Sequence, residues 1–198
     1  MATARGAGSL SELARLGFTD LDATITKLDQ LVSKVGDGGR VALASLAKAG
    51  NPDQALNALL WLADTDSKAL KALLKRNDSA DRLCLVLGAS SSLVDFLRRH
   101  PAQLALFEKA ITALDDQAVM TDRVRKALAP VLAYAISNRQ KNPDVPFDSA
   151  SCWNAVRQAY RAEVVRLAIF DLTAETPWGV LQQVAAGLAD AAGAAIEA

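Results

Sequence analysis

The sequence predicts an all-α fold, a compact bundle of about ten helices, on three observations. Hydrophobic residues make up 51% of the 198 residues, and many are Ala and Leu, which are strong helix formers. Aromatic residues are only 5% and β-branched residues form no alternating runs, which argues against a sheet. Helix-cap signals recur where apolar stretches of helical period begin. We expect one helical domain over residues 9–198 after a frayed N-terminus at 1–8, with the 141–149 loop as a candidate sub-boundary.

The first helices follow from two capping signatures. Ser9 and Glu12 form one capping box, whose short helix ends near Gly17, and Thr19 with Asp22 repeats the pattern. An apolar face of helical period follows it, consisting of Leu21, Ile25, Leu28, Val32 and Val35.

The next helices are separated by Gly, Asn and Pro signals. The GDGG run at 36–39 is expected to end the preceding helix as a flexible turn. Asn51 and Pro52 restart the chain as N-cap and first helical residue, with Gln54 closing the box. Helices are then expected at 40–48, 52–63, 66–76 and 79–87.

The second half of the chain contains longer helical stretches. A polar break at 115–122 separates a helix at 101–114 from one at 121–139 that Pro130 is expected to kink. The loop at 141–149 contains two prolines. A long helix at 150–175 and an Ala-rich helix after the Thr-Pro-Trp break at 176–178 complete the prediction.

Charge and hydropathy argue against nucleic-acid and membrane partners. The 22 basic and 22 acidic residues give zero net charge, whereas nucleic-acid binders usually carry a basic face. No apolar stretch approaches the roughly 20 residues of a membrane span, and the start lacks the apolar region of a secretion signal. Cys84 and Cys152 match no metal or redox spacing, so we expect two free thiols, no metal site and a cytoplasmic location.

The stretch LVLGASSSLVDFLRRHP, residues 85–101, has two interpretations. A phosphate-binding loop of the P-loop type needs a Lys after its last Gly, and none is present. We therefore predict a corner between two helices, with Gly88 at positive φ and a capping box of Ser92 and Asp95. A weak anion contact at the second helix start stays open.

Three further groups of charged residues are candidate sites. Arg98, Arg99 and His100 are interpreted either as a contact for an acidic partner or as charges that complement a helix dipole. The two D-x-D pairs, at 20–22 and 64–66, would share Mg²⁺ on a strand, but on a helix their side chains diverge by about 200°. We interpret both pairs as helix caps.

The helix over 155–172 contains the third group. Arg157 and Arg161 are i, i+4 neighbours, Glu163 is placed to pair with Arg166, and Arg pairs suit phosphate or carboxylate recognition. The alternative is a solvated face beside an apolar stripe. That stripe is expected to consist of Val156, Tyr160, Val164, Leu167 and either Phe170 or Asp171.

Three segments together resemble a known family. LARLGFTDLDATITKL (13–28), LVLGASSSLVDFLRRHP (85–101) and VRQAYRAEVVRLAIFDL (156–172) resemble the N-terminal part of the bifunctional glutamine synthetase adenylyltransferase/adenylyl-removing enzymes. The final segment, 180–198, resembles the helix that leads into the first catalytic core of that family.

The resemblance implies an enzyme of nitrogen regulation with nucleotidyltransferase cores. Such an enzyme uses ATP and Mg²⁺ to attach AMP to a Tyr of glutamine synthetase and removes it with phosphate, under control by PII signal proteins and glutamine. Its first Gly-rich turn and D-x-D strand would lie past Ala198, so no catalytic residue or cofactor site carries over, and the chain alone is expected to be inactive. The resemblance implies that five charged residues brace the core or face its nucleotide: Arg157, Arg161, Glu163, Arg166 and Asp171.

An independent helical interaction module without an enzymatic core is the main alternative, and a small helical enzyme with its own site lacks any nucleophile–base pair. Reading the coding region past Ala198 distinguishes the nucleotidyltransferase of the resembled family from the independent module. A Gly-rich turn followed by D-x-D on a predicted strand supports the enzyme, and a stop codon with no gene for such a core nearby supports the module.

Overall fold

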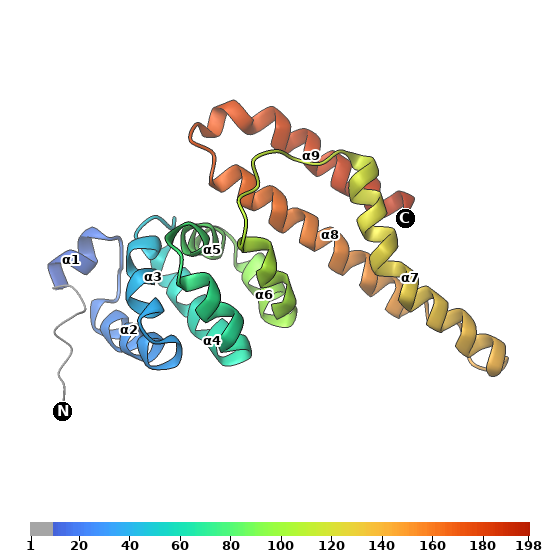
Figure 1. Cartoon of the computed structure of the whole chain (residues 1–198), viewed down its shortest axis with the longest axis horizontal. Helices are drawn as coiled ribbons and strands as arrows, with labels where there is room; N and C mark the ends of the chain where they lie inside the picture. Colours follow the sequence, from blue (N-terminus) through green and yellow to red (C-terminus); the bar gives the residue numbers. More distant parts are fainter. Residues whose placement is uncertain (1–9) are drawn as a thin grey trace. The chain divides into compact units, whose positions relative to one another are not determined.

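The computed structural model describes residues 10–198 and confirms the all-α prediction. Within this range there are nine α-helices, one 3₁₀ helix and no strand (Figure 1). The predicted frayed N-terminus at 1–8 and the Ser9 cap lie outside the described residues. None of the described helices is both long and apolar enough to cross a bilayer. The elements are α1 (Leu10–Arg15), α2 (Leu21–Val35), α3 (Gly38–Leu46), α4 (Pro52–Leu74), α5 (Asn77–Ala89), α6 (Ser91–Arg99), η1 (Pro101–Phe107), α7 (Gln117–Lys141), α8 (Ser149–Leu172) and α9 (Pro177–Glu197).

The described residues form two compact units, which divide between Ala110 and Ile111. The first unit contains α1 to η1, and the second contains α7 to α9. The loop at 141–149, the candidate sub-boundary, joins α7 and α8, which pack against each other within the second unit. That the two units make one domain stays a prediction.

Helix α4 is the centre of the first unit, where it packs against α2, α3, α5, α6 and η1. It begins as predicted, because the Asn51 side chain accepts from the Gln54 backbone N–H at 2.9 Å. The Gln54 amide does not close the box and instead donates to the Leu87 carbonyl at 2.6 Å. The helices predicted at 52–63 and 66–76 are one element kinked at Asp66, whose carboxylate caps the second half through the Ala69 N–H.

The Leu residues of α4 explain why it is central. They follow one another at steps of three and four on each side of the kink and form one long apolar face, along which several neighbours pack. Its fully buried Leu residues are Leu56, Leu59, Leu62, Leu70 and Leu74.

Two predicted caps are wrong by one or two residues. The N-cap of α2 is Asp20, which accepts from the Ala23 N–H at 3.1 Å, whereas Thr19 donates its N–H and hydroxyl to Asp53 at 2.9 and 2.7 Å. The N-cap of α6 is Ser90, which accepts from Leu93, rather than the predicted Ser92. In both places several residues of cap chemistry are adjacent, and the tertiary fold selects one of them.

Two glycine interpretations also change. Gly88 lies inside α5 and does not have positive φ; it is needed because an added Cβ would come within 2.7 Å of the Ala49 Cβ. In the GDGG run, Gly36 has φ of 71° and ends α2, but α3 already begins at Gly38. The turn is therefore shorter than the predicted four residues.

The helix predicted at 101–114 is only the 3₁₀ helix η1, and an irregular stretch follows it to Asp116. Buried Arg82 holds the end of η1, donating to the carbonyls of Phe107 at 2.9 and 3.1 Å and of Glu108 at 3.2 Å. These bonds satisfy carbonyls that a short helix leaves without partners.

In the second unit α7, α8 and α9 pack pairwise, with α9 running alongside α8 (Figure 1). Helix α7 begins four residues earlier than predicted, because Asp116 caps it through the Val119 N–H at 2.9 Å, and it continues through Pro130. The three helices share an apolar core cluster that consists of Met120, Val124, Leu167, Ala191 and Ala194.

Candidate functional site

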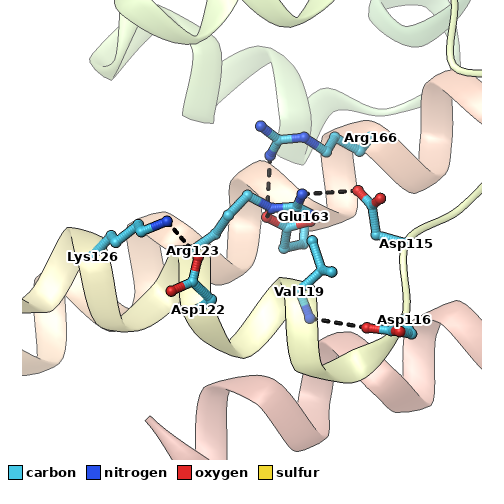
Figure 2. A network of polar contacts seen from close by, with 8 residues as sticks. All are labelled: Asp115, Asp116, Val119, Asp122, Arg123, Lys126, Glu163 and Arg166. Atoms are coloured by element: carbon cyan, nitrogen blue, oxygen red, sulfur yellow. Dashed lines mark hydrogen bonds and ion pairs between the residues drawn. The ribbon is translucent and has the colours of Figure 1, made fainter.

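The most organised polar cluster of the second unit surrounds Glu163, in the middle of α8. The Glu163 side chain is only 3% exposed, and both of its oxygens accept from Arg123 of α7. Arg123 Nε lies 2.8 Å from one oxygen, and Arg123 Nη2 lies 2.7 Å from the other (Figure 2). This planar, two-bond pairing is the strongest geometry available to a carboxylate and a guanidinium.

Two more charged groups complete what we call the Glu163 network: Asp115, Arg123, Glu163 and Arg166. Arg166 donates to Glu163 at 3.1 Å from one helical turn along α8. Arg123 also donates to Asp115 at 2.8 Å, and Asp115 lies in the segment just before α7 (Figure 2). Two guanidinium groups and two carboxylates give the network zero net charge.

Burial and pairing act in opposite directions on the two arginines. Burial lowers the pKa of Arg123, but the hydrogen bonds to Glu163 and Asp115 outweigh it and raise that pKa above its ordinary value. For Arg166, burial lowers the pKa more than Glu163 raises it. Arginine does not lose its proton in proteins, so both stay charged and Glu163 stays paired.

The geometry makes the network a lock between α7 and α8. Each Glu163 oxygen already accepts a hydrogen bond from a guanidinium of Arg123, so the carboxylate joins the two helices. The cavity beside it measures about 10 Å³, room for about one water and far too little for a nucleotide. Among residues 10–198, no three His, Cys, Asp or Glu side chains gather where they could hold a metal ion.

The other charged residues predicted on this helix do not join the network. Arg157 is exposed and donates to Asn154 on its own helix at 3.1 Å. Arg161 is also exposed, and Asp171 is half-buried near the end of α8. The predicted Glu163–Arg166 pair is confirmed, whereas the proposed roles of all five residues in bracing or nucleotide contact stay predictions.

Sequence reasoning did not identify Arg123 and Asp115, although one signal pointed to them. Glu163 lies three residues after Tyr160 and four before Leu167, and both pack in or against the apolar core. The buried stripe therefore contains Glu163 where we expected Val164, which is only half-buried. An acid on a buried stripe requires a basic partner from a facing helix.

Arg98, Arg99 and His100 lie at the end of α6 in the first unit. The Arg98 guanidinium lies over the Trp61 ring, with 5.7 Å between Arg98 Cζ and the ring centroid. Arg98 and Arg99 lie 3.5 and 3.8 Å from Asp95, both exposed pairs of the weak kind, and the His100 ring packs against Phe96.

Trp61 and Asp95, which Arg98 and Arg99 contact, belong to the lining of an open groove of about 510 Å³ between α4 and α6. Six of its eight lining residues carry an amide, hydroxyl or carboxylate group, and the other two are Val94 and half-exposed Trp61. The Asp53 carboxylate in this lining already accepts two hydrogen bonds from Thr19. The partner-contact role of the three basic residues stays a prediction.

The similarity to known proteins covers nearly all of this chain but only a small part of each relative. No family model and no solved structure matches the chain. A protein of Leifsonia xyli subsp. xyli named bifunctional glutamine synthetase adenylyltransferase/adenylyl-removing enzyme is 33% identical over 96% of this chain. Proteins of the same name from Cutibacterium acnes and Streptomyces avermitilis are 33% and 30% identical over 91% and 100% of it. In each case the chain spans 18% of the relative's own length.

Proposed function

Because nearly the whole chain is homologous to a part of the bifunctional glutamine synthetase adenylyltransferase/adenylyl-removing enzymes, we propose that it is the N-terminal helical segment of such an enzyme. The similarity over 96% of the chain carries this proposal. The segment contributes structure, and adenylyl transfer and removal take place in nucleotidyltransferase cores elsewhere in the longer polypeptide.

On its own the segment is catalytically inactive. The acids, thiols and single His of residues 10–198 do not gather into a cation site, and the buried acid Glu163 is held by two arginines. In the whole enzyme we assign ATP and Mg²⁺ to the cores. Glutamine synthetase is then the substrate and a PII signal protein the regulator.

The Glu163 network positions the long helix α8 within this segment. Its bonds to Arg123 fix α8 against α7 over the same turns where Leu167 packs on Met120 and Val124. A helix held on one side by both apolar packing and a two-bond ion pair is suited to support a neighbouring domain. Arg157 and Arg161 are exposed on that helix, where a following core would be able to contact them.

The proposal is tested with three proteins: the full-length polypeptide, residues 1–198 alone, and the remainder without them. We expect the full-length protein to transfer AMP from ATP to glutamine synthetase and to release ADP from the adenylylated form with phosphate. Residues 1–198 should do neither. Transfer or release by residues 1–198 alone would disprove the inactivity, and a full-length protein that acts on neither form would disprove the assignment.

A further inference from the structure

Helix α9 is apolar on two opposite sides. One side is made of small residues, among them Gly187, Ala191 and Ala194, which are buried against the rest of the second unit. The other side exposes large apolar side chains to solvent. Their exposed fractions are 88% for Trp178, 55% for Leu181, 44% for Leu188 and 86% for Ile196.

The exposed side is a continuous stripe and not a scatter of residues. Trp178, Leu181, Ala185, Leu188 and Ala192 follow one another at steps of three, four, three and four, which is the spacing of a coiled-coil seam. Ile196 lies 18 residues after Trp178, five full turns at 3.6 residues each, so it returns to the same side. The stripe therefore extends along nearly the whole helix.

Charge is confined to the flank of α9. Its charged residues are Asp190 and Glu197, which project roughly 100–120° away from Trp178 around the helix axis. Glu197 also accepts from Gln117 of α7 at 2.8 Å, so it is directed toward the second unit. A helix that is apolar on both sides is typical of one that is buried on both sides.

The spacing of the stripe indicates the shape of its partner. Apolar side chains at every third or fourth position line one face of a helix, the pattern by which two helices pack against each other at a shallow crossing angle. The small residues among them, Ala185 and Ala192, allow a second helix to approach closely. An apolar face of this length left in water is a liability for a soluble protein.

We propose that the α9 stripe is an internal interface, covered by an amphipathic helix from the part of the longer polypeptide outside residues 1–198. This proposal rests on the proposed function. The chain spans 18% of its relatives' length, so the covering helix is supplied on the same polypeptide and at high effective concentration. A second copy of the chain is the competing occupant.

The test follows the exposure of Trp178 in the full-length polypeptide. Other tryptophans are removed by conservative substitution, including Trp61→Phe and Trp153→Phe, and acrylamide quenching is compared with the same protein in urea. We expect Trp178 to be several-fold less accessible in the folded protein and its emission to be blue-shifted. Leu181→Asp with Leu188→Asp should restore quenching while circular dichroism keeps the helical signal.

Two results would overturn the interface. Trp178 quenched as readily in the folded as in the unfolded protein means that the stripe is uncovered. Protection that appears only with rising concentration, together with a dimer in sedimentation, means that a second copy covers it. Either result would leave the proposed function intact, because that is judged separately by AMP transfer to glutamine synthetase.

Discussion

The pairing of Glu163 with Arg123 should contribute more to the stability of the second unit than any other polar interaction in it. A double-mutant cycle tests this pairing with three variants: Glu163→Ala, Arg123→Ala and the double variant. The cycle isolates the energy of the pair from the other effects of each truncation. It is measured on the free energy of unfolding.

The structure sets the expected magnitude. Hydrogen bonds to charged groups contribute about 1.5–3 kcal/mol each, and this pair has two, at 2.8 and 2.7 Å. The Arg123 side chain is 28% exposed, so water screens part of the interaction. We therefore expect a coupling energy of about 2 kcal/mol. Glu163→Ala alone should cost about 3 kcal/mol, the low end for breaking a buried pair, since Arg166 also loses its partner.

Urea unfolding followed by tryptophan fluorescence is the assay. A Trp61→Phe background removes the reporter of the first unit and leaves Trp153 and Trp178, which lie on α8 and α9. The fluorescence then reports the second unit even if the two units unfold separately.

The matched control is the pair of Asp122 and Lys126 on α7, also shown in Figure 2. Their charges lie 2.6 Å apart, as close as those of the buried pair, but both side chains are mostly exposed. Their coupling should be about 0.3–0.5 kcal/mol. If the Glu163–Arg123 coupling is no larger than this control, burial does not strengthen the pair and the lock between α7 and α8 is refuted.

Three further predictions concern single positions. Gly88→Ala should destabilise the first unit by about 1–3 kcal/mol, because the new Cβ would lie 2.7 Å from that of Ala49; an unchanged urea midpoint would contradict the close approach. Asp66→Ala should cost about 1 kcal/mol, measured in the same way, since it removes the cap at the kink of α4, and no loss would mean that the cap is not needed. With Ellman's reagent at pH 8, Cys152 should react promptly and Cys84 only as the chain unfolds, because burial raises the pKa of the Cys84 thiol. Equal rates for the two thiols would show that Cys84 is accessible.

Local signals predicted the helices well but selected the wrong residue wherever two candidates were adjacent. Asn51 was identified correctly because Pro52 follows it, and Pro is favoured at the first position of a helix. Thr19 and Asp20 both have cap chemistry, and the choice depends on Asp53, which is 34 residues away and takes both donors of Thr19. A contact of that range leaves no trace in the spacing of nearby residues. The same reasoning applies to Ser90 and its serine neighbours.

The candidate site was predictable to the extent that it is local. Glu163 and Arg166 are three residues apart on one helix, and their pairing follows from helix geometry. Arg123 is 40 residues earlier on a different helix, and its position depends on which side of α7 packs against α8. Only the placement of an acid between Tyr160 and Leu167 indicated that such a partner must exist.

The two acidic pairs predicted as caps lie in or at the start of helices and not on a strand. On a helix, carboxylates two residues apart diverge, and here Asp20 and Asp66 cap helices while Asp64 forms an ion pair with Lys34. Only Asp20 and Asp66 act as the predicted caps; Asp22 lies exposed in the first turn of α2. A cation that serves nucleotidyl transfer needs carboxylates that converge, as alternate residues of a strand do. Among residues 10–198 no three such side chains gather, and the proposed function places the metal ligands in another part of the longer polypeptide.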